Sequence, residues 1–137
     1  MPGLQFSRRL AIAAGVALPL VETLRRWDQL SELSVWPFWL DDFAIGGFML
    51  YGAWRTRAAD ARGVSTLAAA WGFACGMGYS SFFGQLADLS QSDPSGMQSS
   101  IVVAIKGVML ALALAALIVT LTQSRAPFSS GGTKPGA

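Results

Sequence analysis

The chain has 137 residues, of which 53% are hydrophobic and 13% are charged, and its mean hydropathy is +0.45. A soluble domain carries roughly 25% charged residues, so this composition argues against a soluble domain and predicts a polytopic membrane protein. The net charge of +2 contains no basic run that could follow a phosphate backbone, and one cysteine without any histidine excludes an intrachain disulfide or a Cys/His zinc site, so we expect no nucleic-acid partner, metal or cofactor.

The first apolar run predicts a helix over about residues 10–27. Ser7, Arg8 and Arg9, followed by an apolar dozen, are also typical of a secretory signal with a twin-arginine start. No small-x-small cleavage site follows at the right distance, which favours a retained helix over a cleaved signal. About 18 residues at roughly 1.5 Å each reach about 27 Å, which suffices to cross a bilayer with arginines snorkelling at both ends.

The second run, about residues 37–54, contains two adjacent acids. Asp41 and Asp42 would each cost roughly 2.5–3.5 kcal/mol at the bilayer centre, so the helix inserts only if both lie near one edge. Pro37 in the first turn fits this placement. Helical phase puts Asp42 on the same face as Gly46, which we expect to pack against other helices, whereas Asp41 is expected to be interfacial.

The third run, about residues 65–87, matches a hydrocarbon core of about 30 Å and carries two faces of interest. A narrow stripe runs from small residues through Gly78 to Gln85 and should face other helices. On the opposite face, Gly72 and Gly76 form a GxxxG pair that would let another backbone approach closely. Plain helix packing is the favoured interpretation of this span, and a solute path is the alternative.

The fourth run, about residues 100–121, is the most uniformly apolar. Its small residues form one predicted packing stripe: Ala104, Gly107, Ala111 and Ala115. Lys106 lies roughly 160–200° from most of this stripe, so we expect its side chain to snorkel to lipid headgroups. Residues 124–137 are rich in Gly, Ser and Pro and are predicted to be a disordered tail, which leaves residues 1–123 as one transmembrane domain.

Basic residues predict the orientation of this all-α, four-helix transmembrane bundle. With both termini in the cytoplasm, that side collects seven basic residues: Arg8, Arg9, Arg55, Arg57, Arg62, Arg125 and Lys134. Three lie toward the other side: Arg25, Arg26 and Lys106. This bias follows the positive-inside rule. Arginine outnumbers lysine eight to two and alanine is abundant, so we expect a multi-pass protein of a bacterial inner (plasma) membrane.

Polar side chains at similar depth near the outer face form a candidate intramembrane polar site: Asp42, Asp41, Glu22, Gln85 and Lys106. An intramembrane carboxylate is by default a functional hypothesis, and Asp42 is the inward candidate. Glu22 has a local explanation, because Arg25 and Arg26 follow it at i+3 and i+4 in the favourable order for ion pairs.

The sequence contains no nucleophile elbow, no phosphate-binding loop and no histidine base, and adjacent acids on a helix point about 100° apart. We therefore expect no catalytic residue. The favoured hypothesis is a non-enzymatic accessory or assembly component that acts through helix-helix contacts within the lipid bilayer, as a homo-oligomer or with a membrane-protein partner. The alternative is a small proton- or ion-coupled transporter that works as an oligomer and uses a carboxylate near the outer face.

Overall fold

The computed structural model describes residues 2–29, 31–58, 61–87, 89, 93 and 96–124. Over these residues the prediction of an all-α fold with four long helices is confirmed: α1 Pro2–Arg25, α2 Trp36–Arg55, α3 Ala61–Ala87 and α4 Ser99–Ser124. Single turns of 3-10 helix flank the first two connections: η1 Trp27–Gln29, η2 Leu33–Val35 and η3 Thr56–Ala58. The predicted tail falls outside the described residues except for Ser124.

The first helix is longer than predicted, because it begins at residue 2 and not near residue 10. Pro2 suits the first helical position, where its missing N–H would have had no partner. The arginine pair Arg8 and Arg9 therefore lies inside α1, two turns into the helix.

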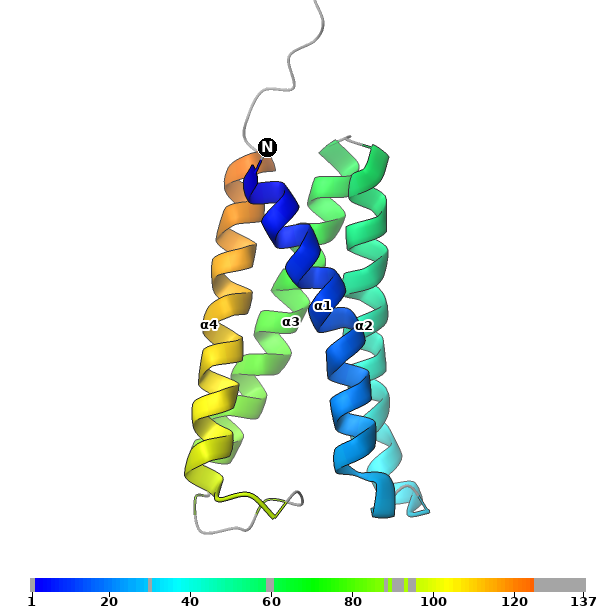
Figure 1. The fold of residues 1–137 in the computed structure, drawn as a ribbon, viewed down its shortest axis with the longest axis vertical. Helices are drawn as coiled ribbons and strands as arrows, with labels where there is room; N and C mark the ends of the chain where they lie inside the picture. The colour runs from blue at the N-terminus through cyan, green and yellow to red at the C-terminus, as the bar shows by residue number, and fades with distance from the viewer. Residues whose placement is uncertain are drawn as a thin grey trace, which may run out of the picture.

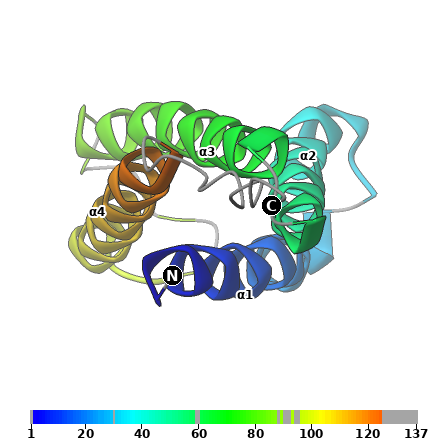
Figure 2. The same ribbon diagram turned by 90° about the horizontal axis from the view of Figure 1, so that it is seen from above.

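The four helices run alternately up and down (Figure 1). The upper end of the molecule holds the N-terminus, the α2–α3 connection and the end of α4, whereas the lower end holds the other two connections. Seen from above, the helices follow one another around a ring, and α1 closes it by contacting both α2 and α4 (Figure 2). Because α1 crosses obliquely, it lies beside α4 at the upper end and beside α2 at the lower end.

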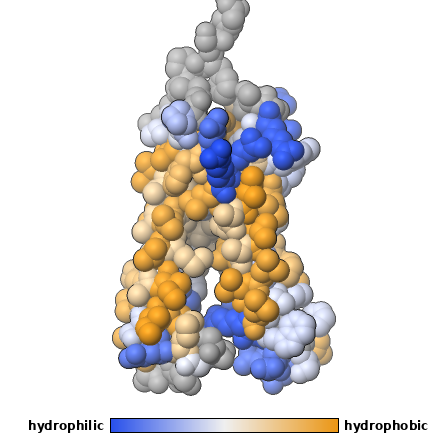
Figure 3. All heavy atoms as spheres, in the orientation of Figure 1, coloured by the Kyte–Doolittle hydropathy of each residue, from blue (hydrophilic) through white to orange (hydrophobic). Residues whose placement is uncertain are grey.

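On the face drawn in Figure 3, the surface is apolar around the middle and hydrophilic toward both ends. Among the described residues, two helices are long and apolar enough to cross a membrane, namely Pro2–Arg25 and Ser99–Gln123. The two predicted spans between them do not qualify. In α2 the reason is the pair Asp41 and Asp42, and in α3 it is the content of five glycines and three serines, which lowers the mean hydropathy.

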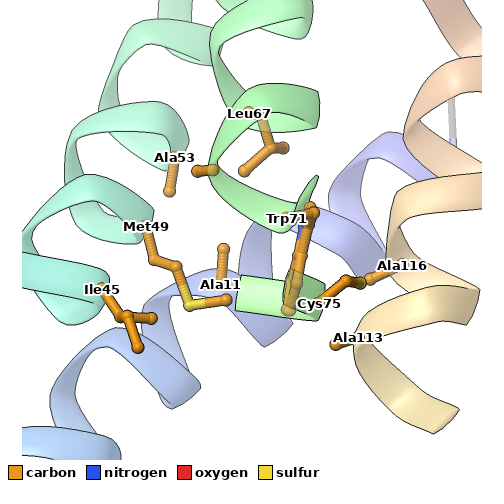
Figure 4. Packing of buried hydrophobic residues seen from close by; sticks show 10 residues of the cluster. Ala11, Ile45, Met49, Ala53, Leu67, Trp71, Cys75, Ala113 and Ala116 are labelled. Atoms are coloured by element: carbon orange, nitrogen blue, oxygen red, sulfur yellow. The ribbon is translucent and has the colours of Figure 1, made fainter. Parts of the chain in front are cut away.

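The core lies where the four helices meet above the middle of the bundle, and half of its members are alanine: Ala11, Ile45, Met49, Ala53, Leu67, Ala70, Trp71, Cys75, Ala113 and Ala116. Met49 of α2 reaches toward Ala11 of α1, and the ring of Trp71 fills the space between α3 and α4 (Figure 4). Small residues let the backbones approach, so few large side chains suffice to fill the centre: Ile45, Met49, Leu67 and Trp71.

The closest backbone approach joins α1 and α2 at two glycines. A Cβ atom added to Gly46 would lie 2.6 Å from the carbonyl oxygen of Gly15 and 2.7 Å from Cγ of Pro19. Pro19 has no N–H, so it cannot donate the usual helical hydrogen bond to that Gly15 carbonyl. The structure thus places Gly46 at a helix contact, as expected, and identifies Gly15 as its partner, which sequence reasoning missed.

The other predicted packing glycines divide into two groups. Gly78 and Gly107 lie between α3 and α4, where an added Cβ atom would be 3.5 Å from Leu110 and 3.1 Å from Phe82, respectively. Gly72 and Gly76 have no atom within 4 Å of such a Cβ and are exposed. The GxxxG pair therefore takes no part in packing this chain's own helices.

The predicted packing face of α4 needs correction. Ala104, Ala111 and Ala115 are exposed, whereas the buried positions of α4 follow another stripe: Ser99, Val102, Ala113, Ala116 and Thr120. In this second stripe the buried hydroxyl of Thr120 shares a hydrogen bond with Ser7 of α1. Satisfying buried polar groups therefore outweighs residue size in choosing the face.

Candidate functional site

The predicted polar residues do gather at the lower end of the bundle. Glu22 lies in the last turn of α1, where it accepts hydrogen bonds from Arg25 and from Nε of Arg26. The Arg25 contact measures 3.2 Å, and both pairs are local, at i+3 and i+4. The local explanation of Glu22 given by the sequence therefore matches its placement.

Arg25 also makes a long-range contact. Its Nε and its second guanidinium nitrogen donate to the two carboxylate oxygens of Asp93, at 3.1 and 2.6 Å. The Asp93 side chain is fully buried, and its paired geometry is the strong form of an arginine-carboxylate interaction. This ion pair ties the end of α1 to the connection between α3 and α4. Sequence reasoning missed it, because 68 positions separate the two residues and no local pattern relates them.

Asp42 and Asp41 occupy different environments on α2. Asp41 is exposed, whereas Asp42 is half-buried and faces the end of α1. Glu22 and Asp41 repel the Asp42 carboxylate, and Arg25 and Arg26 attract it. Among the described residues, no arginine or lysine nitrogen lies within the 4.0 Å of an ion pair with Asp42.

Lys106 extends from α4 toward α3. Its ammonium donates to Oε1 of Gln85 at 3.1 Å and approaches the backbone carbonyl of Ser81 at 3.5 Å. The charges that act on it include Arg25 at the end of α1 and Asp93 in the connection between α3 and α4. The structure thus gives Lys106 acceptors on α3 that the sequence did not indicate, and snorkelling to lipid headgroups stays a prediction.

Together these charges nearly cancel, because three acids face three bases: Glu22, Asp42 and Asp93, and Arg25, Arg26 and Lys106. We call these six residues and Gln85 the lower polar cluster. Between the α1–α2 pair and the α3–α4 pair the lower half of the molecule is visibly hollowed, with hydrophilic residues toward its outer end (Figure 3).

A second hydrogen-bonded feature fastens α2 to α1 near this cluster. The indole N–H of Trp39 donates to Oγ1 of Thr23 at 2.9 Å, and that hydroxyl donates to the carbonyl of Pro19 at 2.6 Å. Each group is satisfied, since the hydroxyl accepts one hydrogen bond and donates another. The hollow is thus bounded on this side by two helices with little freedom to separate.

The upper end is closed by a buried chain of hydrogen bonds, which we call the upper seal. Trp71 donates its indole N–H to Oγ of Ser7 at 2.8 Å, and the two hydroxyls of Ser7 and Thr120 lie 2.6 Å apart. Thr120 bonds the carbonyl of Ala116 at 2.7 Å, so its only proton is used and Ser7 must donate to it. Ser7 and Thr120 are fully buried, and the upper seal joins α1, α3 and α4.

The arrangement offers charge and hydrogen bonding without an evident reaction centre. The described residues contain no group of three or more His, Cys, Asp or Glu side chains that could hold a metal ion. Cys75 is buried beside Trp71 in the core and is not part of the lower polar cluster. Comparison of the chain with protein-family models, with curated proteins and with solved structures gives no match.

Proposed function

We propose that the chain is a small integral membrane protein whose four helices cross a bacterial plasma membrane. The observation that carries this proposal is the exposed apolar surface. In the most apolar 18-residue windows of α1 and α4 only 17% of the residues are buried, whereas the core helix of a soluble protein would be mostly buried. Large side chains such as Leu24, Val108 and Ile118 are 60–73% exposed, and hydrocarbon is the medium that removes their contact with water.

The helices α2 and α3 are less apolar than α1 and α4, but they can cross the membrane as members of the bundle. The two aspartates of α2 lie in its first two turns, near the lower end, where the cost of insertion is smaller than at the bilayer centre. The upper end carries Arg8, Arg9 and Arg57, which would place it on the cytoplasmic side. The lower polar cluster then lies at the extracytoplasmic side.

Within the membrane, the role that the geometry supports best is that of a non-enzymatic accessory or assembly component. The support comes from α3, where Gly72 and Gly76 are exposed with open space above both of them. A glycine pair at this spacing permits close approach of a helix from another chain. That chain would be a second copy or a different membrane protein.

Reporter fusions test the membrane placement. A reporter after residue 57 and one at the C-terminus should report the cytoplasm, and one inserted after residue 31 should report the opposite compartment. Extraction of the protein by alkaline carbonate, or the same compartment for all three fusions, would refute the membrane proposal. Residues 31 and 57 lie in connections, so insertions there leave the helices intact.

Matched glycine variants test the assembly role. Gly76→Leu should abolish chemical crosslinking to the partner, while Gly84→Leu, on the same helix and with equally open surroundings, should leave it intact. A Cβ atom at either position would have no neighbour within 4 Å and both glycines are exposed, so both variants should fold. Equal crosslinking of the two variants would show that this face of α3 does not bind the partner.

One observation favours the transporter as a second candidate. The carboxylate of Asp42 is half-buried on α2, one of the helices that border the hollow, whereas the buried contacts of the upper seal join α1, α3 and α4 at the other end. For such a transporter Asp42→Asn should abolish proton-linked flux in reconstituted vesicles, and Asp41→Asn, on the exposed side, should not. Unchanged flux in the Asp42 variant would reject the transporter.

A further inference from the structure

The hollow in the lower half of the molecule has an apolar part and a hydrophilic part. Its upper part adjoins the apolar core, and hydrophilic residues lie toward its outer end (Figure 3). The helices α2 and α4 contact each other far less than neighbouring helices do, so they do not close the hollow between them. In a bilayer such a space does not remain empty, because removing contacts from the atoms that line it costs free energy. An amphipathic occupant would match both parts.

Two charges in the lower polar cluster lack an ion-pair partner among the described residues. Arg25 and Arg26 are matched by Glu22 and Asp93, but the Lys106 ammonium has only neutral acceptors and the Asp42 carboxylate has no nitrogen within ion-pair distance. Lys106 is on α4 and Asp42 is on α2, and these two helices belong to the helix pairs on opposite sides of the hollow (Figure 1).

We infer that the hollow binds one zwitterionic glycerophospholipid that carries a primary ammonium on its headgroup. Its phosphate would lie at Lys106 and its ammonium at Asp42, so each protein charge gains a partner of opposite sign. The acyl chains would occupy the apolar part of the hollow. This inference rests on the proposed membrane location, and it adds a ligand that the assembly role does not require.

Charge complementarity separates this lipid from its competitors. An anionic phosphatidylglycerol offers Lys106 a phosphate but places no cation at Asp42. A phosphatidylcholine has a cation that cannot donate a hydrogen bond to the carboxylate, because its nitrogen is fully methylated. A partner helix would satisfy the apolar part but would need its own pair of opposite charges at the outer end.

Native mass spectrometry of the full chain tests the inference. Protein is released from vesicles that contain equal parts of phosphatidylethanolamine, phosphatidylglycerol and phosphatidylcholine, and the bound lipid is identified. We expect one phosphatidylethanolamine per chain, retained about tenfold over the other two lipids. Asp42→Asn and Lys106→Gln should each lower this preference about tenfold, whereas Lys106→Arg, which keeps the charge, should preserve it.

The controls separate this inference from the membrane proposal. Asp41→Asn and Arg57→Gln remove exposed charges beside and far from the lower polar cluster, and both should leave the lipid preference unchanged. Equal retention of the three lipids, or equal effects of the Asp41 and Asp42 variants, would overturn the inference. Membrane insertion would still be supported if the protein resists extraction by alkaline carbonate. A polypeptide retained in place of lipid would also overturn it, since the hollow would then be a protein docking surface.

Discussion

The contact between Gly15 and Gly46 gives a sharp test of the packing, because an adjacent glycine provides its control. Gly46→Ala would place a Cβ atom 2.6 Å from the Gly15 carbonyl oxygen and 2.7 Å from the Pro19 ring. These are backbone and ring atoms that cannot rotate away, so α1 and α2 must separate. Overpacking of this kind typically costs about 1–3 kcal/mol.

Gly47→Ala introduces the same methyl group one residue later, where no atom lies within 4 Å. Both variants gain up to about 1 kcal/mol because alanine is the better helix former. This gain cancels in the comparison, so the free energy of unfolding of the Gly46 variant should lie about 1–3 kcal/mol below that of the Gly47 variant.

The assay is reversible unfolding of the purified protein in mixed micelles, driven by an increasing fraction of sodium dodecyl sulfate and followed by circular dichroism. Gly15→Ala provides a second measurement from the other helix, since its Cβ atom would lie 2.9 Å from the Gly46 carbonyl oxygen. Equal midpoints for the Gly46 and Gly47 variants would refute the close crossing of α1 and α2.

Three further predictions concern the upper seal, the lower polar cluster and the core. Ser7→Ala leaves the buried Trp71 N–H without its acceptor and should lower the free energy of unfolding by about 1–3 kcal/mol in the same assay. Asp93→Asn removes a buried charge from the paired contact with Arg25 and should destabilise the protein by about 1–3 kcal/mol. Cys75 is buried, so folded protein should react with a water-soluble maleimide far more slowly than unfolded protein.

Each of these predictions has a control at an exposed position. Thr122→Val removes a hydroxyl that only bonds its own helix backbone, and Asp28→Asn removes an exposed acid, so both should change stability by less than about 0.5 kcal/mol. Ser31→Cys adds a thiol in the exposed connection between α1 and α2 that should react rapidly in the folded state. Destabilisation by Thr122→Val equal to that by Ser7→Ala would contradict the upper seal, and rapid labelling of Cys75 would contradict the core.

The arrangement of helices could be predicted because it depends on local composition. Four apolar runs separated by polar or turn-forming segments specify four helices, and the gathering of Glu22, Asp42 and Lys106 at one end follows from their shared distance from the connections. The choice of Gly46 as a contact also followed from local periodicity, because its face carries the smaller residues.

The pairing of side chains could not be predicted, since each decisive contact joins distant parts of the chain. Ser7 looks like part of a signal sequence until Thr120, 113 positions later, supplies its partner. Size alone suggested the wrong face of α4, because helical phase does not show that Thr120 has a partner on α1. Asp93 was an ordinary loop acid in the sequence, and only the tertiary fold aligns it with Arg25.

The long separation between Ser7 and Thr120 has a consequence for biosynthesis. At translation rates of roughly 5–20 residues per second, the threonine is made about 6–23 s after the serine. A nascent chain that contains only the first three helices can already form the hydrogen bond from Trp71 to Ser7. The ring of four helices is still open where α4 will pack. A chaperone or insertase that shields that side would therefore be needed only until the last helix leaves the ribosome.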